Sequence, residues 1–369
     1  MSETPPPMGD SRPPQTRRET ATRIGFTLGL GFAGGVLFYL LHFPLAFMIG
    51  ALVAVTVAAI AGAPVQAAPR LRVVMVSILG VLLGSAFTPD MLHQMGAWAV
   101  SLLWLIPLII VTVWAGKAAM QRWAGLDRVT AYFASVPGGL MEMTLIGGAE
   151  GGDERRLSLL HALRIVIVVL ILPIWFRLTT GYVSPPISLS FASWPPLVDM
   201  IILGTCALCG YPLARLCRLP APQLTGSMLL SAAVHLTGLT QSGPPALLVA
   251  LAQTIIGASL GARFRNTPTQ FFGRTFAMAF GLTILMLLIS LIVAWIVHAT
   301  TGLPLTSAIL AFAPGGLAEM SLIALYLGGD TAYVAAHHVV RITMVVLLVP
   351  PAYKLLKRLF PGWLAPPKP

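Results

Sequence analysis

The chain has 369 residues, of which 57% are hydrophobic and only 9% carry a charge. Soluble domains carry about 25% charged residues, so this composition excludes an ordinary soluble protein. The formal net charge is +11, but the basic residues lie in short loops and tails rather than on one face. We therefore expect no direct binding to nucleic acid. Apolar runs long enough to cross a bilayer recur along the chain, which predicts an all-α polytopic membrane protein whose main partner is the lipid bilayer.

In chain order, residues 1–22 are rich in Pro, Arg and Thr, and we expect them to form a disordered cytoplasmic tail. A first membrane repeat, residues 23–177, then holds six apolar segments near 24–41, 43–61, 71–87, 97–115, 128–148 and 159–176. Residues 178–196 are the expected linker. A second repeat, residues 197–353, holds six more segments near 197–214, 222–239, 245–262, 275–297, 305–327 and 332–353. Residues 354–369 are the expected cytoplasmic C-terminal tail.

The two repeats are recognised by a segment that occurs twice. Residues 137–173 and 314–350 align without a gap at an offset of 177, with 18 of 37 positions identical. A shorter match lies upstream, where Ile-Leu-Gly-x-x-Leu-Gly at 78–84 corresponds to Ile-Ile-Gly-x-x-Leu-Gly at 255–261. The sequence therefore predicts an internal duplication that covers nearly the whole membrane part.

The positions of the basic residues predict that the two repeats have opposite orientations. In the first repeat, Arg70 and Arg72 follow the second segment, whereas in the second repeat Arg215 and Arg218 follow the first. Basic loops stay in the cytoplasm, so the two repeats must be inserted in opposite orientations. Opposite orientations require an odd number of crossings in each repeat. We expect ten spans plus two re-entrant segments, with both termini in the cytoplasm; a variant with three crossings in the same stretch is the alternative. Inverted repeats of this kind are typical of secondary transporters.

Each copy of the repeated segment begins with a helix-breaking tripeptide. Proline removes a backbone donor, and paired glycines cost roughly 1 kcal/mol each in a helix. We expect a broken helix in each copy, within the bilayer, and the alternative is a simple kink or a close packing contact. The residues that form these breaks are Pro137, Gly138, Gly139, Pro314, Gly315 and Gly316.

Ionisable residues follow each break. Glu142 and Glu319 come a few residues later, in the first turn of the next half-helix. An ionisable group in a membrane costs several kcal/mol unless it is paired or wet, which makes both carboxylates candidates for binding a proton or a cation. The alternative is a carboxylate that only stabilises a helix N-terminus.

Further along each copy, a histidine and an arginine share one helix face. His161 and Arg164 are spaced i,i+3, as are His338 and Arg341. One interpretation is a structural ion pair between an arginine and Glu142 or Glu319. The other is an anion-attracting centre formed by the arginines and the half-helix N-termini, with the glutamates or histidines as proton carriers.

The remaining polar residues of the repeat have simpler explanations. Asp153 and Asp330 follow Gly-Gly pairs, and we expect each to cap the next helix. His337 beside His338 resembles a metal pair, but adjacent residues point to different helix faces. We expect no metal centre, no cofactor and no catalytic residue.

The duplicated Pro-Gly-Gly motif, with Glu-Met after it and then Gly-Gly-Asp and His-x-x-Arg-Ile, resembles the membrane AbrB duplication family of bacteria over residues 23–353. This family is distinct from the soluble DNA-binding protein that shares its name. The resemblance implies a bacterial inner-membrane protein, and members are labelled as ammonia monooxygenases or as regulators of gene expression. It supplies no agreed site residues and no substrate.

Three functions follow as expectations. The first is a secondary transporter of a small polar solute, with proton coupling as an option. The second is a membrane sensor that regulates gene expression indirectly, since no soluble DNA-binding domain is evident. The third, an ammonia monooxygenase-like enzyme, would need a copper or iron site, and the spacing of the histidines does not predict one. An oligomer is compatible with the sequence.

Overall fold

The computed structural model describes residues 16–89, 91, 95–181, 194–265 and 269–360. Over these residues the chain is helical and contains no strand. The helices of the N-terminal half are α1 (Arg17–Leu40), α2 (Ala46–Ile60), α3 (Pro69–Gly84), α4 (Met95–Leu103), α5 (Leu105–Ala124), α6 (Arg128–Ala134), α7 (Leu140–Ala149) and α8 (Glu154–Thr180). Those of the C-terminal half are α9 (Leu197–Leu216), α10 (Pro222–Leu236), α11 (Ala246–Gly261), a 3-10 turn η3 (Ala262–Phe264), α12 (Thr269–Thr301), α13 (Leu305–Phe312), α14 (Leu317–Tyr326) and α15 (Thr331–Leu359).

Seven helical segments in the described part of the chain are long and apolar enough to cross a membrane. They contain α1, α4 with α5, α8, α9, α11, α12 and α15. The other apolar helices are shorter, and α2, α3 and α10 have 15 or 16 residues each. The protein is therefore a multi-pass integral membrane protein.

The first and last helices are longer than the sequence predicted. Helix α1 begins at Arg17, inside the stretch 1–22 that we expected to be a disordered tail, because Thr16 and Glu19 form a capping box. At the other end, α15 continues past residue 353 to Leu359, so the expected tail is helical at its start. Residues 1–15 and 361–369, and most of the expected linker 178–196, lie outside the described residues.

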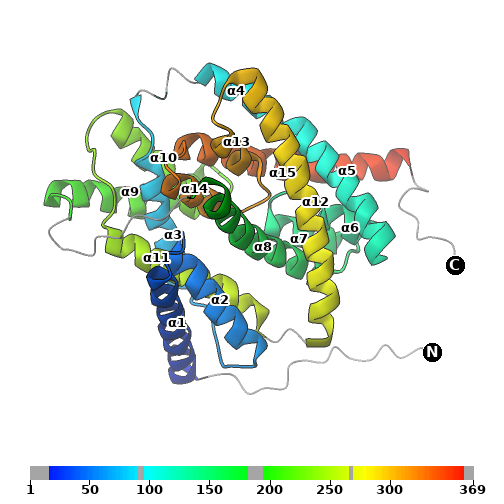
Figure 1. Cartoon of the computed structure of the whole chain (residues 1–369), viewed down its shortest axis with the longest axis horizontal. Helices are drawn as coiled ribbons and strands as arrows, with labels where there is room; N and C mark the ends of the chain where they lie inside the picture. Colours follow the sequence, from blue (N-terminus) through cyan, green and yellow to red (C-terminus); the bar gives the residue numbers. More distant parts are fainter. Residues whose placement is uncertain (1–15, 90, 92–94, 182–193, 266–268, 361–369) are drawn as a thin grey trace.

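The helices form two bundles, and each bundle takes helices from both halves of the chain (Figure 1). The first bundle consists of α1, α2, α3, α9, α10 and α11, on the left of the view. The second consists of α4 to α8 and α12 to α15. Helices α3, α14 and α15 are among those that connect the two bundles.

Glycines at the helix crossings hold the first bundle together. Helix α3 contacts α10 through Gly80, where an added Cβ atom would lie 2.6 Å from the carbonyl oxygen of Leu224, and through Gly84. Helix α11 contacts α2 in the same way, through Gly257 and Gly261. Only residues without a side chain allow backbones to approach this closely. The glycine motif that occurs twice in the sequence therefore joins the two halves of the chain.

The turns before α2 and α10 share a rare backbone conformation. Among the described non-glycine residues, the positive φ angles are those of His42, Leu45, Arg218 and Ala221. They form two pairs at a constant separation of 176 residues, and Leu45 and Ala221 are the N-cap residues of α2 and α10. Such conformations are uncommon outside glycine, so their recurrence reflects the same local fold at two places.

Both Pro-Gly-Gly segments interrupt a helix. The first separates α6 from α7, and the second separates α13 from α14. Gly139 caps α7 with a φ of 59°, a left-handed conformation that favours glycine. Gly316 caps α14 in the extended region instead, with a φ of −79°. The breaks predicted from the sequence are present, and the two copies differ in detail.

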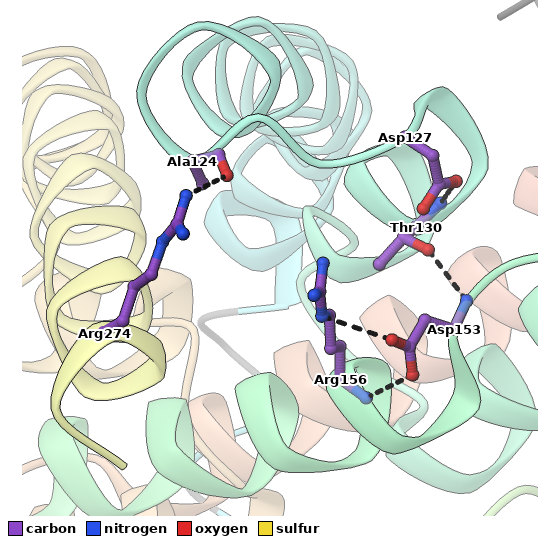
Figure 2. A network of polar contacts seen from close by, with 6 residues as sticks. All are labelled: Ala124, Asp127, Thr130, Asp153, Arg156 and Arg274. Atoms are coloured by element: carbon purple, nitrogen blue, oxygen red, sulfur yellow. Dashed lines mark hydrogen bonds and ion pairs between the residues drawn. The ribbon is translucent and has the colours of Figure 1, made fainter. Parts of the chain in front are cut away.

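A chain of caps fixes the first broken helix (Figure 2). Asp127 accepts a hydrogen bond from the backbone N–H of Thr130 at 2.8 Å and caps α6. The hydroxyl of Thr130 accepts one from the backbone N–H of Asp153 at 2.8 Å. Asp153 in turn caps α8 by accepting from the N–H of Arg156 at 3.0 Å. The start of α6 is thereby tied to the start of α8. Nearby, Arg274 of α12 donates to the carbonyl of Ala124 at the end of α5, at 3.5 Å.

The second broken helix uses the equivalent contacts. Asp330 caps α15 by accepting from the N–H of Tyr333 at 2.9 Å. Its own N–H donates to the hydroxyl of Ser307 in α13 at 3.1 Å. The capping role predicted for Asp153 and Asp330 is confirmed.

We predict that Gly84→Leu destabilises the protein, because the leucine would press on the backbone of α10 at Met228. Forced overpacking costs about 1–3 kcal/mol or more. Thermal unfolding in detergent measures the effect. Gly204→Leu on α9 is the matched control, since that position has open space around it. Equal melting temperatures for the two variants would contradict the crossing described above.

We predict that Asp330→Ala costs about 1 kcal/mol of stability through loss of the cap, whereas Asp330→Asn retains it. Burial raises the pKa of Asp330, and the N–H groups of Tyr333 and Ala332 partly oppose this shift, so ionisation is less favourable in the folded protein than in the unfolded chain. A neutral asparagine keeps the oxygen acceptor and avoids that penalty. Thermal unfolding at neutral pH compares the variants, and an equal loss for alanine and asparagine would show that the negative charge itself is needed.

Candidate functional site

A cavity of about 390 Å³ lies where the two bundles meet. Both Pro-Gly-Gly breaks line it, with the starts of α7 and α14 and parts of α8 and α15. The first bundle contributes α3, the start of α10, and α11 with η3. Its volume falls in the range typical of small-molecule sites, about 300–1,000 Å³.

Two carboxylates line this cavity. Glu142 and Glu319 are each the third residue of their half-helix and are half-buried. Glu319 folds back over Gly316, where a side chain would collide with its carboxylate. Among the described residues, neither glutamate takes part in an ion pair. The alternative of a structural ion pair between these glutamates and the arginines is therefore wrong, because the arginines use their N–H groups on backbone carbonyls instead.

Arg341 holds the second broken helix in place. Its side chain is 1% exposed. It donates to the carbonyl oxygens of Ala313 and Gly315, the latter at 2.9 Å, and so satisfies backbone acceptors that the break leaves without helical partners. A further contact of 2.8 Å joins it to Nδ1 of His338. Three partners thus fix this guanidinium.

Arg164 is the corresponding residue of the first copy, and it is much less satisfied. Its side chain is 3% exposed. In the described part of the chain its one hydrogen bond is to the carbonyl oxygen of Val136, at 2.6 Å, and its Nε atom, like that of Arg341, is buried with no partner. Both arginines line the cavity. Arg164 and Arg341 thus present two like charges to the same cavity.

The two histidines are buried behind the arginines and do not line the cavity. Nε2 of His338 contacts the carbonyl of Leu310 at 2.9 Å. The equivalent carbonyl, that of Phe133, lies near His161. Neither ring nitrogen of His161 meets a partner at hydrogen-bonding geometry within the described chain. Of the six ionisable residues singled out from the sequence, the cavity therefore brings together the two glutamates and the two arginines.

Two further arginines line the cavity and were not singled out as site residues. Arg72 at the start of α3 and Arg263 in η3 are exposed. The sequence showed both as basic loop residues, and only the packing of α3 and α11 against the broken helices brings them to the site. With four guanidinium groups and two carboxylates, the lining has a net charge of +2 when both glutamates are ionised.

A second buried polar cluster also escaped the sequence analysis. Ser101 contacts the hydroxyl of Tyr333 at 2.5 Å and Nε2 of His337 at 2.9 Å. These contacts join α4 to α15 within the second bundle. As expected from their adjacent positions, His337 and His338 have separate sets of partners. Among the residues that the structure describes, no three His, Cys, Asp or Glu side chains gather closely enough to hold a metal ion.

The arrangement favours binding of a small polar molecule. The cavity combines charged groups with apolar walls from α8, α10, α11 and α15, among them Ile165, Leu224, Ile256 and Ile342. The half-helices α7 and α14 both begin at the cavity, so their N-terminal N–H groups add partial positive charge. Ligand-binding sites usually have apolar walls and a few convergent polar groups, and this cavity has both.

Comparison with known proteins agrees with this architecture. A family model described as "Transition state regulatory protein AbrB" matches residues 47–357. The protein YhjN of Bacillus subtilis (strain 168) is 28% identical over 355 residues, covering 90% of this chain and 92% of that protein. A protein of Escherichia coli (strain K12) named "Putative regulator AbrB" is 22% identical over 329 residues, covering 89% of this chain and 92% of its own length.

The match to the family model extends from α2 nearly to the end of α15 and so includes both Pro-Gly-Gly breaks and the whole cavity lining. The long apolar helices agree with a family of integral membrane proteins. The chain therefore belongs to the AbrB family.

Proposed function

We propose that this protein is a secondary transporter of a small polar solute that works by alternating access. The observation that carries this proposal is the charged cavity at the junction of two helix bundles, lined by both broken helices. Secondary transporters place their sites at such junctions and build them from discontinuous helices. A rocking motion of one bundle against the other would expose the cavity to each side in turn.

Matching contacts support an origin by internal duplication. The caps Thr130–Asp153 and Ser307–Asp330 are separated by the same offset of 177 residues, and so are the carbonyl contacts of Arg164 and Arg341. The glycine crossings support it as well, because Gly80 meets Leu224 and Gly257 meets Met48 with the halves exchanged. We infer two inverted repeats, with ten spans and two re-entrant segments.

The charge distribution supports an orientation in the bacterial inner membrane with both termini in the cytoplasm. Arg72 and Arg263 both belong to the basic loops that the positive-inside rule assigns to the cytoplasm, and both are exposed at the cavity. In this orientation, the cavity would open to the cytoplasmic side.

The side chains of the cavity suggest a division of roles. Glu142 and Glu319 would bind the coupling proton or a cation, since they are half-buried and carry no ion pair. Arg164 and Arg341 would balance charge or hold an anion, and His161 and His338 would tune protonation from behind them. Transport of this kind needs no catalytic residue and no cofactor.

The second candidate is a membrane sensor with an indirect effect on gene expression. It is favoured by the printed name of the E. coli relative, which calls that protein a regulator. Loss of transport can itself alter gene expression, so the two functions are compatible. The third expectation, an ammonia monooxygenase-like enzyme, has no observation of this cavity that favours it and stays the least favoured prediction.

We predict that Glu319→Gln abolishes transport while the protein stays folded and inserted in the membrane, and that Glu142→Gln/Glu319→Gln does the same. The measurement is proton flux into liposomes that contain a pH dye, after addition of ammonium, inorganic ions or small organic acids. Neutral glutamine keeps the size of the side chain but cannot carry the proton or attract a cation.

Glu150→Gln is the matched control. Glu150 pairs with Lys357 at 2.9 Å and is not part of the cavity lining, so we expect full flux. A solute-dependent flux that survives in Glu319→Gln would end the proposed coupling role. No flux with any solute of the panel in the unmodified protein would favour the sensor.

A further inference from the structure

The two arginines of the cavity occupy equivalent positions but have different surroundings. Arg341 contacts two backbone carbonyls and His338, whereas Arg164 has one hydrogen bond within the described chain. The difference follows from the breaks themselves. In the second copy the carbonyl of Gly315 faces Arg341, whereas in the first copy Gly138 and Gly139 have φ angles of 153° and 59° and Arg164 contacts Val136 alone.

Within the described chain, Arg164 has fewer polar partners than Arg341. The side chain is 3% exposed, its Nε atom is buried without a partner like that of Arg341, and it takes part in no ion pair among the described residues. Unlike Arg341, it has a single backbone carbonyl as its hydrogen-bond partner there. A buried guanidinium without an anion is expensive in a membrane protein. The positive charge of Arg341 at the same cavity adds to that cost. A bound anion would remove both penalties.

The cavity in front of Arg164 suits an anion with an apolar part. Arg72, Arg263 and the starts of α7 and α14 add positive charge around it. Most other lining residues are apolar, such as Leu224, Leu260 and Ile342. An inorganic ion would leave these walls without contacts, whereas an organic carboxylate would use them and would also match the planar fork of a guanidinium.

We propose that the solute is a small organic carboxylate anion, that Arg164 binds its carboxylate group, and that Arg341 is a structural residue that holds the second break in place. The claim that this carboxylate is transported rests on the proposed function. Its binding at Arg164 can be tested without any transport measurement. The two copies would then have diverged, one arginine serving the ligand and the other the fold.

The experiment compares Arg164→Gln, Arg164→Lys and Arg341→Gln with Arg156→Gln, an exposed arginine of the same helix as Arg164. Purified protein in detergent is titrated with butyrate, succinate and benzoate, and separately with inorganic phosphate and methylammonium. Thermal unfolding reports both the stability without ligand and the stabilisation by each probe.

We expect at least one of the three carboxylates to stabilise the unmodified protein. The Kd of that carboxylate should rise at least about 30-fold in Arg164→Gln and remain unchanged in Arg156→Gln. The rise is the one typical of a buried charge pair that loses one partner. Without ligand, Arg341→Gln should melt at a clearly lower temperature than Arg164→Gln. Should Arg164→Gln fail to fold, Arg164→Lys decides, because it keeps the charge but loses the bidentate geometry and should still weaken binding.

Three results would overturn the assignment. They are the absence of stabilisation by all three carboxylates, stronger binding of phosphate or methylammonium than of any carboxylate, and full carboxylate affinity in both Arg164 variants. Carboxylate binding without flux in liposomes would leave the assignment intact and end the transporter proposal. Methylammonium flux without carboxylate binding would overturn the assignment and leave the transporter proposal intact.

Discussion

The contact between a buried arginine and the carbonyls at a helix break is the interaction on which the rest of this structure depends. A helix broken within a membrane exposes backbone acceptors that lipid cannot satisfy, so protein groups or a wet cavity must do so. Arg341 donates to Ala313 and Gly315, and Arg164 donates to Val136. These bonds allow α13 and α6 to end inside the protein, and they place two positive charges beside the breaks.

The broken helices form a cavity only because the other bundle faces them. That bundle is built from the first three helices of each half of the chain, joined at glycines where α3 meets α10 and α11 meets α2. Since each crossing pairs a helix from one half with a helix from the other, neither half can form this bundle alone. The caps at Asp153 and Asp330 fix the broken helices within the second bundle.

The cavity collects charge from residues that are far apart in the sequence. Arg72 and Arg263 come from the first bundle, and Glu142, Glu319, Arg164 and Arg341 come from the second. Among the residues that the structure describes, neither glutamate neutralises an arginine through a direct ion pair. The site thus presents both positive and negative groups to the cavity.

The sequence alone determined the helical membrane class, the positions of the two breaks and the capping aspartates, because composition, proline and glycine act locally on the chain. It also identified four of the charged residues that line the cavity. Tertiary structure decided what could not be read locally: that the arginines bind backbone carbonyls rather than glutamates, that the histidines lie behind them, and that Arg72 and Arg263 reach the site. It also decided the difference between Arg164 and Arg341, since identical residues in matching motifs acquire different partners when the two backbones around them differ.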